Sequence, residues 1–239
     1  MTDAAAASVR EGAVEFTSGR IAVPAVFARP EPAPGRPAPG MLVLHSWWGL
    51  NEHVRDIARR FAQAGFAAFA PDLYASSGGR ATTEPAEAAR LMEALSAQTV
   101  LRDLNAALRC FKAQPDVDHR RVAVAGFSMG GTFALTLACH NSDLKAAVVF
   151  YGKVPPVESL EYLLCPVLFH RGEQDDWVTQ AEADRVRDGL AKFGKTGEVA
   201  VYPDAGHGFF DDTRPDTYRA EAAKQAWART LRFLAVRVR

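Results

Sequence analysis

The chain has 239 residues, of which 48% are hydrophobic and 23% charged, and this composition is ordinary for a globular protein. Lys and Arg together number 28, as do Asp and Glu, so no basic excess indicates binding to nucleic acid or to an anionic membrane surface. No apolar run approaches the roughly 18 residues of a membrane-spanning helix. The N-terminus lacks the basic start and apolar stretch of a signal peptide, and the three cysteines have no metal-type spacing. A cytoplasmic protein with reduced thiols is predicted.

The first forty residues predict a hairpin followed by an irregular connection. Residues 1–10 are rich in Ala, and we expect them to be disordered, with one domain spanning 11–239. Strands are expected at 14–16 and 21–28, joined by turn residues. The proline-rich stretch 29–40 could be a ligand for a partner protein or an extended surface connection. Its position between two strands favours the connection.

From residue 41 onward, apolar runs alternate with segments of helical periodicity. Such alternation predicts a single α/β domain, in which a mostly parallel sheet carries helices on both faces and the N-terminal hairpin is antiparallel. Further strands are expected at 41–45, 66–70, 121–125, 146–151, 166–170 and 199–202. Helices are expected at 52–64, 83–112 (with Thr83 as N-cap and a break near 97–99), 129–140, 180–193 and 215–236.

The segment Gly126-Phe-Ser-Met-Gly130 lies between a predicted strand and a predicted helix. A G-x-S-x-G pattern at such a junction is typical of a nucleophile elbow, a sharp turn that lifts the serine hydroxyl clear of the sheet. Side chains at Gly126 or Gly130 are expected to collide where strand and helix pack closely. The pattern alone is weak, but in this context it makes Ser128 the candidate nucleophile.

A serine nucleophile needs a base to take its proton, and the base needs an acid to orient it. In an α/β fold with a nucleophile elbow, the acid follows the serine in the chain and the histidine follows the acid. Asp175, Asp176 and Glu173 follow the strand at 166–170 and are all candidates for the acid. His207 follows the last strand between two glycines. A surface loop histidine is the alternative for His207, but the order of the three segments favours a catalytic base.

An oxyanion hole requires two backbone N–H groups, and we expect them from Met129, directly after the nucleophile, and from Trp47, in the loop after the first core strand. The indoles of Trp47 and Trp48 could equally be hydrophobic cover. Of the remaining histidines, His170 is expected to be structural, His45 is left open between pocket and core, and His53, His119 and His140 are expected at the surface or at helix ends. Because no group of histidines has metal-site spacing, no metal is expected, and the sequence predicts no cofactor either.

Over nearly its whole length the sequence resembles the dienelactone hydrolase family of the α/β-hydrolase superfamily. The resemblance rests on the segments 46–51, 65–74, 126–131, 151–152, 169–175 and 205–209. The more specific of these are Pro71-Asp-Leu-Tyr74 and the acid loop, which is the segment 169–175 that leads to the candidate carboxylates. It implies a catalytic triad of Ser128, Asp175 and His207, and therefore selects Asp175 over Asp176.

Three positions depart from the family pattern. The family's usual nucleophile is Cys, where this chain has Ser128, and the family's Glu after the first core strand is here Ser46. These two changes agree, because a neighbouring charge can tune a thiol, whereas a serine relies on its histidine during the reaction. The family also grips a substrate carboxylate with arginines. One of these arginines is expected shortly after the histidine, but this chain has Asp211 at that position. Arg80, Arg90 or Arg214 could take its place.

The sequence as a whole predicts a serine hydrolase that cleaves carboxylic esters or lactones through an acyl-enzyme. A thioesterase or peptidase of the same superfamily is one alternative, and a non-catalytic binding protein is another. The partner is expected to be a small molecule, and the oligomeric state is left open between a monomer and a small homo-oligomer. The residues expected to form the substrate pocket are Ser46, Trp48, Tyr74, Phe127, Tyr151 and Trp177.

Overall fold

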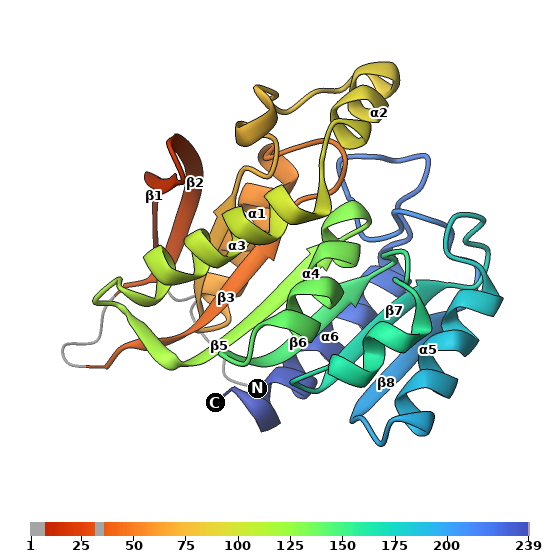
Figure 1. Cartoon of the computed structure of the whole chain (residues 1–239). Helices are drawn as coiled ribbons and strands as arrows, with labels where there is room; N and C mark the ends of the chain where they lie inside the picture. The colour runs from red at the N-terminus through yellow and green to blue at the C-terminus, as the bar shows by residue number, and fades with distance from the viewer. Residues whose placement is uncertain (1–7, 32–35, 239) are drawn as a thin grey trace.

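The computed structural model describes residues 8–31 and 36–238, and an eight-stranded sheet runs through this part of the chain (Figure 1). The strands are β1 Val9–Ser18, β2 Ile21–Pro30, β3 Ala38–Leu44, β4 Ala67–Pro71, β5 Val117–Phe127, β6 Leu144–Phe150, β7 Val167–Gly172 and β8 Gly197–Tyr202. The helices are α1 Glu52–Gln63, α2 Pro85–Glu93, α3 Ala97–Lys112, α4 Met129–His140, α5 Gln180–Lys192 and α6 Ala220–Arg237, with short 3₁₀ turns at Ala75–Ser77 and Val157–Tyr162.

The strand order is β1-β2-β4-β3-β5-β6-β7-β8. Strands β3 to β8 are parallel, whereas β2 pairs antiparallel with both β1 and β4. The predicted single α/β domain with an N-terminal antiparallel hairpin is therefore confirmed. Because the parallel strands point the same way, the loops that follow β3, β5, β7 and β8 emerge at one edge of the sheet.

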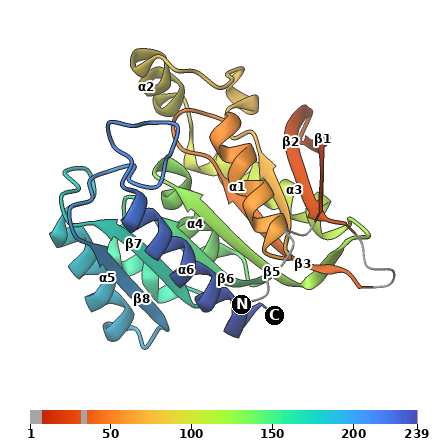
Figure 2. The same ribbon diagram turned by 180° about the vertical axis from the view of Figure 1, so that it is seen from behind.

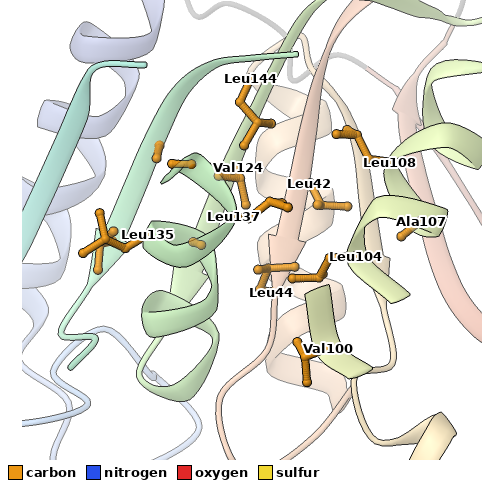
Figure 3. Packing of buried hydrophobic residues seen from close by; sticks show 14 of the residues in the cluster. Leu42, Leu44, Val100, Leu104, Ala107, Leu108, Val124, Leu135, Leu137 and Leu144 are labelled. Atoms are coloured by element: carbon orange, nitrogen blue, oxygen red, sulfur yellow. The ribbon is translucent and has the colours of Figure 1, made fainter. Parts of the chain in front are cut away.

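Two apolar cores lie on opposite faces of the sheet. Helices α3, α4 and α5 cover one face, where Leu104 and Leu137 lie beside the strand residues Leu42 and Leu44 (Figure 3). Helices α1 and α6 cover the other face (Figure 2). The central strands are buried on both sides, and this explains why their sequences read as continuous apolar runs.

Helix α1 shows how the sequence builds this layer. Asn51 caps its start, since the side-chain oxygen accepts a hydrogen bond from Val54 N at 3.2 Å. Ile57 and Phe61 are fully buried on the face predicted for the core. His53 lies in the first turn of α1, so it has the helix-end position that was one of its two expected places, but it is not at the surface, because it is only 5% exposed.

Other predicted bounds need correction. Strand β1 begins at Val9, which shortens the expected disordered segment 1–10, whose first seven residues lie outside the described part. The break in the long helical region falls at 94–96, because the Ser96 side chain caps α3 by accepting from Thr99 N, and α2 begins after Glu84 rather than after Thr83.

The closing helix starts at Ala220 rather than at 215. Residues 214–218 form a turn in which Tyr218 N donates to Arg214 O, and Arg219 N donates to Phe209 O. The proline-rich connection is described only in part, because 32–35 lie outside the described residues, and β3 already begins at Ala38. Within the described residues, no helix is both long and apolar enough to cross a membrane.

Candidate active site

The turn between β5 and α4 places Ser128 at the edge of the sheet in a strained conformation, with φ 52° and ψ −116°. A Cβ on Gly126 would lie 2.0 Å from Gly130 O, and a Cβ on Gly130 would lie 2.4 Å from both Leu44 O and His45 O. The predicted collisions are therefore confirmed. Only glycine allows the first turn of α4 to pack this closely on the ends of β3 and β5.

The structure brings Ser128, His207 and Asp175 together from three separate loops. Ser128 Oγ lies 2.8 Å from His207 Nε2, and His207 Nδ1 lies 3.0 Å from Asp175 Oδ2 and 3.2 Å from Asp175 Oδ1. An ionised carboxylate can only accept hydrogen bonds, so Nδ1 carries the ring hydrogen and donates it to Asp175. Nε2 is then free to accept the hydrogen bond of the Ser128 hydroxyl.

The acid loop after β7 distinguishes between the candidate carboxylates. Asp175 is 3% exposed, and its Oδ1 also accepts hydrogen bonds from Trp177 N at 2.9 Å and Val178 N at 2.8 Å. Asp176 and Glu173 point to solvent instead. The buried Arg171 holds the loop in place, because its guanidinium donates to three oxygens of this segment: Glu173 O, Val178 O and Gln180 Oε1.

Two backbone amides, those of Met129 and Trp47, are the expected donors of the oxyanion hole. Met129 N belongs to the first turn of α4, where helix N–H groups have no partner within the helix. Trp47 N belongs to the turn after β3, which closes with a hydrogen bond from Gly49 N to Ser46 O at 3.1 Å. Among the residues that the structure describes, no acceptor is found for either amide, and both residues line the same cavity.

A cavity of about 450 Å³ opens beside Ser128 and His207, and its walls are largely apolar, with several aromatic rings. Of the residues expected in the pocket, those in the wall are Ser46, Trp48, Phe127, Tyr151 and Trp177. Tyr74 is fully buried beneath the wall, where its hydroxyl donates to Trp47 O at 2.8 Å. Trp177 is 55% exposed and lies at the rim, with its ring centroid 6.2 Å from that of Trp47.

Two cations line the cavity, and the sequence pointed clearly to neither. The Arg214 guanidinium lies 4.4 Å from the ring centroid of Trp48, and Lys153 Nζ lies 5.7 Å from that of Trp177. Arg90 instead forms an exposed ion pair with Glu87, so it is occupied away from the cavity. Arg80 is not part of the wall either.

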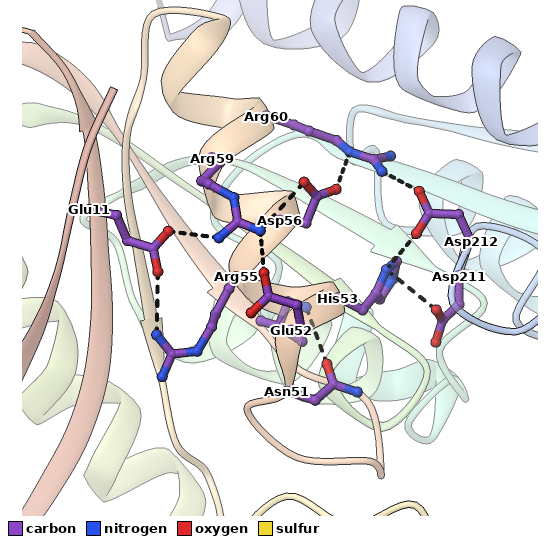
Figure 4. A network of polar contacts seen from close by, with 11 residues as sticks. Glu11, Asn51, Glu52, His53, Arg55, Asp56, Arg59, Arg60, Asp211 and Asp212 are labelled. Carbon is purple, nitrogen blue, oxygen red and sulfur yellow. Dashed lines mark hydrogen bonds and ion pairs between the residues drawn. The ribbon is translucent and has the colours of Figure 1, made fainter. Parts of the chain in front are cut away.

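His53 lies in the cavity wall and is part of a charged network that the sequence did not predict (Figure 4). Its Nδ1 lies 3.4 Å from Asp211 Oδ1 and 3.3 Å from Asp212 Oδ1, and Arg60 pairs with Asp212. Burial opposes ionisation of Asp212, but Arg60 and His53 outweigh it and lower the pKa of this carboxyl. No partner is found in the described residues for the buried His53 Nε2.

His53, Asp211 and Asp212 offer ligand atoms that all lie within 4.8 Å of one another, so their spacing could hold a metal ion. The Arg60 guanidinium pairs with Asp212 and so neutralises part of this charge. His53 lies 159 residues from Asp212 in the chain, which explains why spacing in the sequence did not indicate the cluster.

The other buried histidines have structural partners. His170 bonds to Tyr202 Oη at 2.8 Å and to Thr230 Oγ1 at 3.0 Å, and burial lowers its pKa to about 3, with a smaller effect from Arg229. The expected structural role of His170 is consistent with these contacts. His45 is fully buried and does not line the cavity.

Comparison with known proteins places this geometry in a family. The model of the dienelactone hydrolase family matches residues 23–237. Two bacterial relatives are named "putative carboxymethylenebutenolidase", one from Methylorubrum extorquens and one from Escherichia coli K12. Each is 35% identical, and the alignments cover 84% and 88% of this chain and 73% and 81% of the relatives.

Solved structures agree. A crystal structure titled "putative dienelactone hydrolase" from Klebsiella pneumoniae is 33% identical, covers 95% of this chain and 99% of its own, and has a TM-score of 0.89. A dienelactone hydrolase-like promiscuous phosphotriesterase from metagenomic libraries is 26% identical, covers 96% and 98%, and has a TM-score of 0.87. The chain belongs to the dienelactone hydrolase family.

Proposed function

We propose that this chain hydrolyses carboxylic esters or lactones through an acyl-enzyme formed on Ser128. In this mechanism Ser128 Oγ attacks the carbonyl carbon while its proton passes to His207 Nε2. Asp175 keeps the ring in the productive tautomer and stabilises the imidazolium. The N–H groups of Met129 and Trp47 hold the developing oxyanion. His207 then protonates the leaving alcohol, and water releases the acyl group with His207 again acting as base.

The observation that carries the proposal is the chain of contacts from Ser128 Oγ to His207 Nε2 at 2.8 Å and from His207 Nδ1 to Asp175 Oδ2 at 3.0 Å, at the wall of a cavity. Relatives named for carboxymethylenebutenolidase activity support a lactone or ester as the substrate class. The cations Lys153 and Arg214 in the wall favour substrates that carry an anionic group. A cytoplasmic location stays a prediction from the sequence.

The direct test is covalent labelling with an alkylphosphonate probe, followed by peptide mapping. We expect label on Ser128, and we expect Ser128→Ala to abolish labelling and lower turnover of 4-nitrophenyl butyrate by about four to six orders of magnitude, because triad members act as a unit. Residual turnover within about tenfold of the parent would remove Ser128 from the mechanism. Ser142, an exposed serine outside the cavity, provides the matched control as Ser142→Ala.

The same labelling experiment separates the alternatives. A folded protein whose Ser128 stays unlabelled under conditions that label other serine esterases would instead be a binding protein. If Ser128 is labelled, a panel of matched ester, lactone, thioester and peptide substrates ranks the reaction types. We expect kcat/KM to be highest for an oxygen ester or lactone. A preference for the thioester or the peptide would replace the proposed substrate class without removing the nucleophile.

A further inference from the structure

The peptide unit that carries the Trp47 N–H is held by the neighbouring His45. His45 is fully buried, its Nε2 lies 2.9 Å from Leu73 N, and its Nδ1 lies 2.6 Å from Ser46 O. A backbone N–H can only donate, so Nε2 must be the acceptor for Leu73. The ring hydrogen of the neutral imidazole therefore sits on Nδ1 and is donated to Ser46 O.

Ser46 O and Trp47 N–H belong to the same planar, trans peptide unit, so they point in opposite directions. Ser46 O accepts hydrogen bonds from His45 Nδ1 at 2.6 Å and from Gly49 N at 3.1 Å. Fixing this oxygen fixes the plane of the peptide. The Trp47 N–H is consequently directed away from the His45 ring, and Trp47 itself lines the cavity with Met129 and Ser128.

The next peptide unit is anchored as well. The Tyr74 hydroxyl donates to Trp47 O at 2.8 Å, and the rings of Tyr74 and His45 lie 5.1 Å apart. Burial, aided by the charge of Asp72, raises the pKa of Tyr74 well above its usual value, so the phenol keeps its hydrogen and remains a donor. The carbonyl oxygens on both sides of the Trp47 N–H are therefore tied to buried side chains.

We propose that His45, supported by Tyr74, is a positioning residue that orients the Trp47 N–H of the oxyanion hole. This inference rests on the proposed function. A hydrogen bond to an oxyanion depends steeply on its angle, and the best aim must exist before the charge develops. A peptide free to rotate would still bind substrate but would stabilise the transition state less. His45 therefore acts on turnover through Trp47 without touching the substrate.

The test compares His45→Leu with His45→Asn. Leu fills the buried site but donates nothing, whereas the Asn amide can donate to Ser46 O from the place of Nδ1. We expect His45→Leu to lower kcat for 4-nitrophenyl butyrate about 10- to 100-fold, part of the effect of losing one oxyanion donor, with little change in KM. His45→Asn should be the less stable variant and yet the more active one. A purely structural role predicts that activity follows stability.

Two further measurements keep the inference falsifiable if His45 variants fold poorly. Tyr74→Phe removes one hydroxyl and should lower kcat about three- to tenfold, while the lost buried hydrogen bond should lower Tm by only a few degrees. The inhibition constant of phenylboronic acid, whose tetrahedral adduct uses the oxyanion hole, should rise in parallel with the loss of kcat in each folded variant, whereas that of the product butyrate should not. His170 is another buried, hydrogen-bonded histidine and lies outside the cavity, so His170→Leu is the control for effects of lost stability. Its kcat should stay within about threefold of that of the parent.

The outcomes separate the two proposals. Parent-like kcat in folded His45→Leu, or His45→Asn no more active than His45→Leu, would overturn the positioning role while phosphonate labelling of Ser128 still supports the hydrolase. Full activity of Ser128→Ala would overturn the proposed function itself. If kcat falls but the inhibition constant of phenylboronic acid does not rise, His45 acts on something other than the oxyanion hole, and this result would also overturn the inference.

Discussion

Replacing His170 by Gln should reduce the loss of stability that we expect for this protein in mild acid. Burial, with a smaller contribution from the Arg229 charge, lowers the pKa of His170 from 6.5 to about 3. The native ring stays neutral, whereas the unfolded ring takes up a proton once the pH falls below 6.5. The stabilising contribution is thus fully present above the unfolded pKa and is lost as the pH falls towards the native pKa.

The size of the effect follows from this window. A pH of 5.0 lies about 1.5 units below the unfolded pKa, and one unit corresponds to about 1.4 kcal/mol, so His170 should cost the native state about 2 kcal/mol between pH 7.5 and 5.0. Gln does not titrate and can keep hydrogen bonds to Tyr202 and Thr230. The free-energy gap, which is the free energy of unfolding of the parent minus that of His170→Gln, should therefore fall by about 2 kcal/mol as the pH is lowered from 7.5 to 5.0.

Urea unfolding of parent and variant at both pH values measures this gap, and equal m-values establish that the two transitions are comparable. All other titrating groups are shared by the two proteins, so their contributions cancel in the difference. A gap that stays constant within about 0.5 kcal/mol would refute the reasoning, because His170 would then take up its proton equally in the native and unfolded states.

Further outcomes are expected from the active-site region. Asp175→Asn should lower kcat for ester hydrolysis by about four orders of magnitude, because it disturbs the tautomer of His207. Asp176 is exposed, so Asp176→Asn should change kcat less than about threefold. The reverse order of effects would show that the wrong carboxylate was chosen. Gly126→Ala should lower the free energy of unfolding by about 3 kcal/mol or more, since its Cβ would lie 2.0 Å from a backbone oxygen, and a Tm unchanged by thermal denaturation would contradict this. Lys153→Met should weaken kcat/KM by up to about fivefold for an ester with a free carboxylate but not for its neutral methyl ester, and equal effects on both would exclude charge recognition.

The sequence predicted best those features that depend on neighbouring residues. Helix α4 has the predicted bounds because the glycine-rich turn before it admits one strand-to-helix geometry. The segments that bring Ser128, Asp175 and His207 together could be predicted because each follows a strand, and parallel strands end at one edge. Errors in bounds arose where a local signal competed with a stronger one, as when the Ser96 cap moved the start of α3.

Features that depend on distant contacts escaped sequence reasoning. His53 reads as a polar residue at a helix start, and only the fold brings Asp211 and Asp212 against it. Tyr74 has a ring suited to a pocket wall, but its hydroxyl finds an acceptor in the Trp47 backbone and the ring is buried. Lys153 gave no signal, because a lysine after a glycine is common at surfaces and only the cavity gives it a context.

The placement of the indoles has a practical consequence. Of the chain's four tryptophans, Trp47, Trp48 and Trp177 line the cavity, while Trp227 packs on Phe61 in the α6 layer. Trp177 is more than half exposed and its ring lies 6.0 Å from that of His207. Intrinsic fluorescence is therefore dominated by the site itself, so the spectrum of the unmodified protein can follow ligand entry in real time, without an attached dye or a turnover assay.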